Sequence, residues 1–366
     1  MKSGTRREER RVALVTGSHG LSGRAVYEHL HSRPGWEVIG ASRRAEPPVA
    51  GAPHVAVDLA DRVATSDALA GCAPTHLFFG AYLADHDLAR EAAMNRAILV
   101  NTLDALATAH APLRRVVIFH GAKAYGAHLG PFPTPARESA PAVPGPLLYH
   151  DQERVLREYG QRLGFTWTVL RPDCICGPAV GSPINLLLGV AALAVLARER
   201  GEPLHFPGTV ASAKSLIQVT DTRLLGRAAE WAATSPAARD EIFNVTNGDV
   251  FRWEHMWPLI AGAFGVPAGD IVPARLAEVM PRREPEWHVL VAHHGLVPVP
   301  LTELVDWRFV DAMLGMPYDL ITSTIKIRRA GFGDCIDSGD MFLQLFNELR
   351  RRRYIPPARQ PIGSAR

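Results

Sequence analysis

The feature that most constrains this chain is a glycine motif between a strand-like run and a helix-like run. The short β-branched run Val12–Thr16 leads directly into Gly17, Gly20 and Gly23, which are spaced as GxxGxxG. Apolar residues then recur at helical spacing over residues 22–32. Glycines in this context permit a tight turn and close approach of the backbone to a pyrophosphate, which the helix N-terminus attracts. The motif therefore predicts a Rossmann domain that binds a dinucleotide.

Strand-like runs and segments of helical spacing alternate through the first half of the chain, which is typical of a parallel sheet covered by helices on both faces. Strands are expected at 12–16, 37–41, 54–57, 76–79, 115–119, 166–170 and 241–246. Helices are expected between them at 22–32, 84–110 and 151–163. The fold class is therefore α/β, a doubly wound Rossmann sheet of about seven strands with a smaller, mostly helical lid.

The second half of the chain is less regular and suggests a lid that contacts substrate. Pro/Gly-rich stretches at 126–146 and 177–183 are expected to be loops that border a site. The apolar stretch 184–197 falls short of the roughly 20 residues of a membrane span, so a buried helix is expected. We assign residues 10–180, completed by about 216–248, to the dinucleotide-binding domain, and residues 181–215 and 249–356 to the lid and C-terminal region.

Composition argues against nucleic acid, membranes and metals as partners. The 366 residues include 40 basic and 37 acidic side chains, and this net charge of +3 is too balanced for a nucleic-acid surface. The 4 cysteines form no CxxC pair, so neither a structural metal site nor a disulfide framework is expected. The charged segment 1–11 lacks the pattern of a secretory signal. A cytoplasmic, reducing location is expected, and the sequence is compatible with a monomer or a homodimer.

The end of the second strand distinguishes between the two nicotinamide dinucleotides. A site for NAD usually places Asp or Glu there to bind the ribose 2′-hydroxyl. This chain has Ser42, Arg43 and Arg44 instead, and its next acid is Glu46. Arginine binds a 2′-phosphate through charge-assisted hydrogen bonds, whereas a carboxylate repels it. The predicted cofactor is therefore NADPH. Asp58, after the third strand, is interpreted either as a ligand of the adenine amino group or as a turn aspartate.

Tyr149 and Lys123 form the candidate catalytic pair. Extended short-chain dehydrogenases/reductases carry Tyr-x-x-x-Lys at the start of one helix, and this chain has Tyr149 there but Glu153 at the lysine position. The end of the fifth strand lacks the usual hydroxyl and instead carries Lys123 within residues 121–126. A neighbouring ammonium favours a phenolate and strengthens hydrogen-bond donation by a phenol. We therefore expect Lys123 to act on Tyr149 and both to face the substrate oxygen, with His120 as an alternative proton donor.

These segments resemble the family of progesterone 5β-reductase and iridoid synthase-like enzymes, in which the lysine is displaced in the same way. The family's Thr-Gly-x-Lys-His-Tyr corresponds to His120–Tyr125, its Gly-Pro-Phe to Gly130–Phe132, and its helix start Asn-Phe-Tyr-Tyr-x-x-Glu-Asp to Leu147–Arg154. Further likeness lies in residues 167–172, 204–208 and 243–253. The segment after about residue 315 is more similar to bacterial and fungal members than to plant members.

The resemblance implies NADPH-dependent 1,4-reduction of C=C bonds conjugated to a carbonyl, with the enolate oxygen stabilised by Tyr149 and Lys123 as in an oxyanion hole. The cofactor is expected to contact Gly17, His19, Gly20, Leu21, Gly23, Ser42, Arg43, Arg44, Asp58, Leu59, Ala81, Tyr149, Pro172 and Ile175. The substrate pocket is expected to involve Tyr82, His120, Phe132, His150 and Asn185. His120, Ala124 and His150 depart from the family pattern, so no steroid substrate is implied.

Three other functions stay open at this point. A carbonyl reductase, which adds hydride to the carbonyl carbon, needs the same oxyanion stabilisation. A catalytically silent NADPH-binding regulatory protein would explain the missing strand-end hydroxyl and helix lysine if Lys123 were a surface residue. An epimerase or dehydratase of nucleotide sugars fits the extended fold. The arginines that favour NADPH argue against that function, because such enzymes usually recycle NAD.

Overall fold

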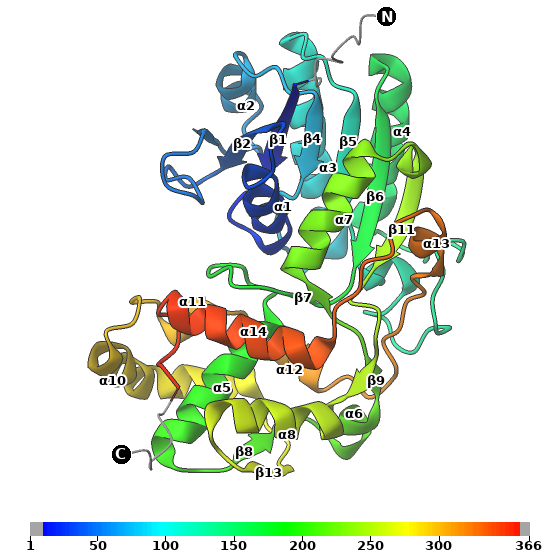
Figure 1. Ribbon diagram of the computed structural model, residues 1–366. Helices are drawn as coiled ribbons and strands as arrows, with labels where there is room; N and C mark the ends of the chain where they lie inside the picture. Colours follow the sequence, from blue (N-terminus) through cyan, green and yellow to red (C-terminus); the bar gives the residue numbers. More distant parts are fainter. Residues whose placement is uncertain (1–9, 359–366) are drawn as a thin grey trace, which may run out of the picture.

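The computed structural model describes residues 10–358, with a parallel sheet in the upper part of Figure 1 and a mostly helical lid below it. The sheet has 7 strands in the order β11-β6-β5-β4-β1-β2-β3. Its strands are β1 (Arg11–Thr16), β2 (Trp36–Ser42), β3 (His54–Ala56), β4 (His76–Phe79), β5 (Arg115–Phe119), β6 (Thr166–Pro172) and β11 (Glu241–Val245). Every neighbouring pair is parallel. The predicted Rossmann fold is confirmed, and the strand ends shift by at most two residues.

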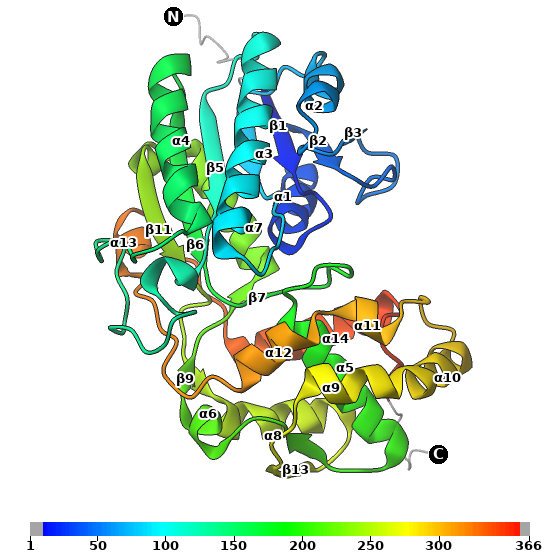
Figure 2. The ribbon, with the colours of Figure 1, turned by 180° about the vertical axis from the view of Figure 1, so that it is seen from behind.

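Helices cover both faces of the sheet, which explains why its strands are apolar on both sides. On the face toward the viewer in Figure 1 lie α1 (Leu21–His31) and α7 (Thr222–Thr234). On the opposite face, seen in Figure 2, lie α2 (Arg62–Leu69), α3 (Leu88–Thr108) and α4 (Leu148–Leu163). Successive side chains of a strand point to opposite faces, so Val15 joins the core under α7 and Leu14 the core under α3.

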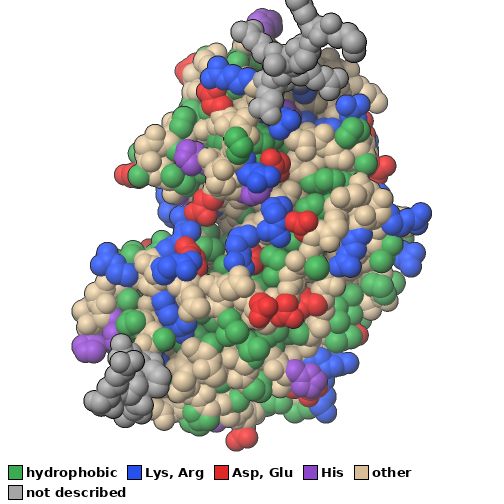
Figure 3. Space-filling model, in the orientation of Figure 1, with side chains coloured by type: hydrophobic (Ala, Val, Ile, Leu, Met, Phe, Trp, Pro, Cys, Tyr) green, Lys and Arg blue, Asp and Glu red, His purple; other side chains and the backbone are tan. Residues whose placement is uncertain are grey.

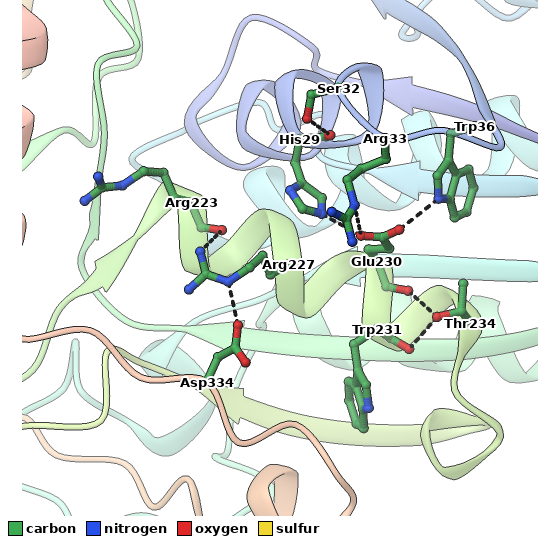
Figure 4. A network of polar contacts seen from close by, with 10 residues as sticks. All are labelled: His29, Ser32, Arg33, Trp36, Arg223, Arg227, Glu230, Trp231, Thr234 and Asp334. Atoms are coloured by element: carbon green, nitrogen blue, oxygen red, sulfur yellow. Dashed lines mark hydrogen bonds and ion pairs between the residues drawn. The ribbon is translucent and has the colours of Figure 1, made fainter.

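A polar network joins α1 to α7 (Figure 4). The carboxylate of Glu230 accepts hydrogen bonds from His29 Nε2 (2.7 Å), Trp36 Nε1 (3.1 Å) and Arg33 Nε (3.2 Å). Burial by itself raises the pKa of Glu230, but the hydrogen bonds from His29 and Trp36 outweigh burial and lower it. Because α1 begins at the glycine turn, this network helps to fix the helix whose N-terminus faces the candidate site.

The lid is built around α5 (Leu186–Arg200), which is the buried helix predicted near residues 184–197. It contacts α8, α12 and α14 and is therefore apolar on nearly all sides. The lid helices are α5, α6 (Val210–Lys214), α8 (Trp253–Phe264), α9 (Leu276–Val279), α10 (Glu284–His294), α11 (Leu301–Leu304), α12 (Trp307–Leu314) and α14 (Ser338–Arg351). None of the helices within residues 10–358 is both long and apolar enough to span a bilayer.

Three small two-stranded sheets complete the lid and its connections to the Rossmann domain. They pair β7 (Ile175–Cys176) with β10 (Thr220–Asp221), β9 (Leu216–Ile217) with β12 (Phe251–Arg252), and β8 (Leu204–Phe206) with β13 (Ala268–Ile271). The β7–β10 pair directly follows β6 and directly precedes α7, so it lies where the chain leaves and re-enters the Rossmann domain.

Part of the C-terminal region packs on the Rossmann domain. At α13 (Ile325–Arg329) the chain returns to the Rossmann domain, where Ile327 and Phe332 join the core under α7. Lys326 Nζ donates to Glu241 Oε2 (2.6 Å) and to the carbonyl of Ile242 (2.9 Å) at the edge strand β11. No signal in the sequence marks this crossing, because a helix of 5 residues is too short to show a helical period.

Candidate functional site

A cavity of about 1640 Å³ extends from the glycine turn after β1 to helix α12 of the lid. In Figure 3 the surface is hollowed between the two domains, and basic side chains border the hollow. In an open parallel sheet, ligands bind at the carboxyl edge where the strand order reverses, which here is between β1 and β4. This cavity is therefore the candidate active site.

The cavity brings together most of the residues predicted from the sequence. Its wall contains Gly17, His19, Gly20, Leu21, Ser42, Arg43, Arg44, Asp58, Leu59, Ala81, Tyr82, His120, Lys123, Tyr149, Pro172 and Ile175. Asp58 Oδ1 accepts from the backbone N–H of Ala60 (3.1 Å), which is the geometry of a turn aspartate. Asp58 nevertheless lines the cavity, so both interpretations of this residue stay open.

Three predicted pocket residues do not line the cavity. Phe132 packs, partly buried, against the core of the lid. His150 is half-buried and lies outside the cavity wall. Asn185 is fully buried, and its Nδ2 donates to the carbonyls of Gly177 (2.8 Å) and Ala179 (3.1 Å). Contrary to expectation, Asn185 therefore stabilises the loop before α5 instead of shaping the pocket.

The glycine turn has the geometry that a dinucleotide pyrophosphate needs. Gly17 has a left-handed φ of +64°, and a Cβ there would lie 2.4 Å from the carbonyl oxygen of Gly80. A Cβ on Gly23 would lie 2.2 Å from the carbonyl oxygen of Gly17, so Gly23 allows α1 to pack closely behind the turn and does not itself line the cavity. Gly20 is the N-cap of α1 and provides no side-chain cap, which leaves first-turn N–H groups for an anion.

The space beyond β2 is lined by uncharged donors and by cations. Ser42 Oγ is hydrogen-bonded to His19 Nδ1 (2.9 Å) and to His54 Nε2 (3.2 Å). Burial, followed by the charge of Arg44, lowers the pKa of His19 to about 4, so the imidazole is neutral at pH 7. The carboxylate of Glu46 acts in the opposite direction on His19, but its effect is smaller than that of Arg44. This end of the cavity, beyond β2, therefore offers neutral hydrogen-bonding groups and positive charge, which suit a phosphate.

Tyr149 lies in the first turn of α4, and its ring stacks on that of His120 with 4.2 Å between the centroids. Burial, followed by the charge of Glu91, raises the pKa of Tyr149, and the cation that opposes this shift is Arg171. The ammonium of Lys123 lies 3.7 Å from the carboxylate of Glu91, the same carboxylate that acts on Tyr149. The raised pKa of Tyr149 does not support the expectation that Lys123 favours a phenolate there, and the pairing of the two residues stays a prediction. Tyr149 is a neutral phenol that can donate its proton.

Glu91 is a site residue that the sequence analysis missed. It lies in the first turn of α3, is 1% exposed, and lines the cavity. The hydroxyl of Tyr82 donates to Glu91 Oε1, while Oε2 faces Lys123. Acidic residues are common in the first turn of a helix because the helix dipole stabilises them. A glutamate at this place in the sequence therefore carries no signal for an active site.

Glu153 occupies the position of the usual lysine but belongs to a buried ion pair. Its Oε1 accepts from Arg171 Nη2 (2.9 Å) and lies 3.7 Å from His120 Nδ1. The side chain of His120 is completely buried, and burial followed by the charge of Arg171 lowers its pKa well below the usual range. His120 is thus a neutral ring that supports Tyr149 by stacking, which makes it a poor proton donor.

Comparisons with known proteins find a matching family and several similar enzymes. A PRISE-like Rossmann-fold domain matches residues 53–296. Over 97% of its length the chain is 29% identical to (S)-8-oxocitronellyl enol synthase of Catharanthus roseus, and the match covers 95% of that protein. It is 30% identical, over 94% of this chain and 91% of the relative, to an enzyme of the same name from Nepeta racemosa. It is 28% identical, over 94% and 93%, to 3-oxo-Delta(4,5)-steroid 5-beta-reductase of Arabidopsis thaliana.

Solved structures show the same fold at low identity. UDP-glucose 4-epimerase of Thermotoga maritima aligns with a TM-score of 0.67 and 17% identity, covering 93% of this chain and 99% of that chain. The Thermus thermophilus enzyme of that name, in complex with NAD, aligns with a TM-score of 0.66 and 20% identity over the same shares. At these identities the likeness concerns the fold alone.

Proposed function

Because the chain belongs to the PRISE-like Rossmann-fold family, we propose that it is an NADPH-dependent reductase of C=C bonds conjugated to a carbonyl. The names of its relatives support a reductase. The observation that carries the proposal is the neutral phenol of Tyr149, which faces a cavity that begins at a dinucleotide-type turn. NADPH supplies hydride when it is bound there, and the chain has to bind it, orient the enone and stabilise negative charge on the carbonyl oxygen.

The residues divide this work between the two ends of the cavity. The backbone from Gly17 to Gly20 and the N-terminus of α1 would hold the pyrophosphate. Tyr149 donates a hydrogen bond to the carbonyl oxygen, and this bond strengthens as the oxygen becomes an enolate. Lys123 contributes positive charge to the same wall. The apolar side chains Phe309 and Met313 of α12 line the far end, where the carbon skeleton of the substrate would lie.

The preference for NADPH rests on the basic end beyond β2. Arg43 and Arg44 line the cavity there, and the effect of Arg44 on His19 exceeds that of Glu46. A 2′-phosphate would accept charge-assisted hydrogen bonds here, whereas no carboxylate is placed to bind a free ribose 2′-hydroxyl.

Three further statements stay predictions: a cytoplasmic location, a homodimer, and the likeness of the C-terminal segment to bacterial and fungal members.

Product analysis tests the proposed reaction. The purified chain is supplied with NADPH and a panel of small enals and enones, and the products are identified by mass spectrometry. We expect saturated carbonyl compounds, and a loss of about 10²- to 10⁴-fold in kcat/KM in Tyr149→Phe, as for removal of a general acid. Tyr159→Phe is the matched control, because Tyr159 lies on the same helix but donates to Asp104 (2.9 Å), away from the cavity.

The other outcomes lead to different conclusions. Allylic alcohols as products would replace conjugate reduction by carbonyl reduction. NADPH binding without turnover of any substrate would favour a regulatory role. Full activity of Tyr149→Phe would remove Tyr149 from the mechanism.

A further inference from the structure

Asp173 is a buried acid that the proposed reduction does not yet use. It directly follows β6, lines the cavity, and is 6% exposed. Its Oδ2 has no hydrogen-bond partner among the residues that the structure describes. Burial of an uncompensated carboxylate is costly, and groups of this kind are concentrated at functional sites. The position of Asp173 in the cavity wall therefore makes it a candidate for a role in the reaction.

The backbone holds Asp173 rigidly in this place. The hydroxyl of Thr220 accepts from the N–H of Asp173 (3.1 Å) and donates to the carbonyl of Asp173 (2.7 Å). The next residue, Cys174, has a left-handed φ of +34°, which is uncommon for a residue with a side chain. Strain of this kind is found where the surrounding structure fixes a functional group. The backbone of Asp173 thus has a defined position at the end of β6.

The phenol of Tyr149 lies against the same strand end. A Cβ on Gly121 would be 3.2 Å from the Tyr149 hydroxyl and 3.5 Å from the carbonyl oxygen of Pro172, the residue before Asp173. The carboxylate charge of Asp173 contributes to raising the pKa of Tyr149. The phenol therefore lies near the end of β6, and the side chains of Tyr149 and Asp173 line the same cavity without a direct hydrogen bond between them.

Few charged groups influence Asp173. The charge of Asp173 raises the pKa of two titratable groups, Tyr149 on α4 and Cys174 in the same turn. Cys176 on β7 lies next to Cys174, and Thr220 on β10 is uncharged. Burial raises the pKa of Asp173 to about 7, and the backbone N–H of Cys174 is the group that acts in the opposite direction. Asp173 therefore carries a proton in a large fraction of molecules at neutral pH.

We propose that Asp173 stores the proton that the reduction consumes and returns it to Tyr149, through water in the cavity that both residues line, after Tyr149 has protonated the substrate. This inference depends on the proposed function for its substrate, but the protonated acid is a property of the chain itself. Asp173 acts through Tyr149, which is the residue that protonates the substrate.

The proposed transfer balances atoms and electrons. Hydride from the reduced dinucleotide forms a C–H bond at the β-carbon, the C=C π bond breaks, and its electron pair moves to the carbonyl oxygen. The O–H bond of Tyr149 breaks as the enolate oxygen takes its proton, and the O–H bond of Asp173 breaks to restore the phenol. The products are an enol, which tautomerises to the saturated carbonyl compound, the oxidised dinucleotide, and a carboxylate on Asp173 that water reprotonates before the next turnover.

The first test needs no turnover. Protein labelled with ¹³C at the aspartate carboxyl groups is titrated by NMR, with Asp173→Asn used to assign the resonance. We expect one resonance that titrates near pH 7 and is missing from the variant. A spectrum in which every aspartate titrates in the ordinary range, near 3.9, would overturn the proposal whatever the enzyme reduces.

The second test is the pH profile of kcat for the reduction. We expect wild-type kcat to fall above about pH 7, by up to tenfold per pH unit, as Asp173 loses its proton. Asp173→Asn should lose about 10²-fold at pH 6 and show no such fall, because its amide does not titrate. Asp67→Asn, an exposed change on α2, is the control and should retain the wild-type profile. An unchanged profile in Asp173→Asn would contradict the proposal, while failure of the proposed function would appear as absence of turnover in both proteins.

Discussion

Replacing Arg44 by alanine tests which dinucleotide the cleft selects. Arg44 lines the cavity beside Ser42, and its charge is felt at His19 within the glycine turn. A hydrogen bond between an arginine and a phosphate contributes about 1.5–3 kcal/mol. Because Arg44 is exposed, solvent screening favours the lower end of this range. We therefore expect the Kd of NADPH to rise by about tenfold, which corresponds to about 1.4 kcal/mol.

A second contact of Arg44 makes NADH the necessary comparison. Arg44 Nη2 lies 2.4 Å from the place of a Cβ on Gly181, so the guanidinium packs on the loop that leads into α5. Loss of this packing would loosen the loop and weaken binding of both dinucleotides equally. Loss of a phosphate contact weakens binding of NADPH alone, because NADH has no 2′-phosphate.

The assay is a fluorescence titration of each reduced dinucleotide at low and moderate salt. Arg96→Ala, an exposed change on α3, is the matched control for removal of one positive charge. We expect the Kd of NADH to stay the same in Arg44→Ala and the salt dependence of NADPH binding to become weaker. Equal losses for NADPH and NADH would refute the phosphate assignment and leave Arg44 with a structural role.

Two further predictions concern carboxylates. Glu91→Gln removes the charge that, after burial, contributes most to the raised pKa of Tyr149, so this pKa should fall. The phenolate absorbance of the variant, compared with that of Glu91→Gln/Tyr149→Phe, reports the ionisation of Tyr149. Equal absorbance of the two proteins would contradict the placement of Glu91 beside Tyr149. In Glu230→Gln, the free energy of unfolding at pH 7 should decrease by about 1 kcal/mol, through loss of charge-assisted hydrogen bonds. Because hydrogen bonds from His29 and Trp36 outweigh burial and lower the pKa of folded Glu230, its carboxylate stabilises the fold above the unfolded pKa of about 4.3. That contribution is lost as the pH falls through the folded pKa, so urea titrations of wild type and Glu230→Gln should converge in acid.

The Rossmann sheet could be predicted from the sequence because its signals are local. Each strand is a short apolar run, and the GxxGxxG turn requires only neighbouring residues. The lid gave weaker signals, since α5 is apolar on nearly all sides and α13 has only 5 residues. The return of Ile327 to the Rossmann core depends on contacts with residues far away in the sequence, which no local pattern records.

The sequence predicted most residues of the candidate site, but it did not predict which side chains they contact. Tyr149 and Lys123 were found from their places relative to a helix start and a strand end. The sequence placed Lys123 beside Tyr149, whereas the structure directs it to Glu91. The difference arises because Glu91 comes from α3, and only the packing of α3 against α4 brings its carboxylate to this wall. The side chain of Lys123 points toward the nearest buried carboxylate, and the sequence motif around Lys123 does not contain that carboxylate.

The buried pair between Glu153 and Arg171 gives a physical reason for the displaced lysine. Arg171 donates to Glu153 (2.9 Å) and to the hydroxyl of Tyr125 (3.1 Å), which in turn donates to Asn244 (2.5 Å) on β11. A lysine at position 153 would place a second cation beside the buried guanidinium, and breaking a buried pair in this way costs about 3–5 kcal/mol. While Arg171 links β6 to α4 and to β11, position 153 therefore favours an acidic residue over a lysine. The positive charge that the proposed reaction needs at the enolate oxygen then has to come from another element, and Lys123, which follows β5 and lines the cavity, is the candidate for this role.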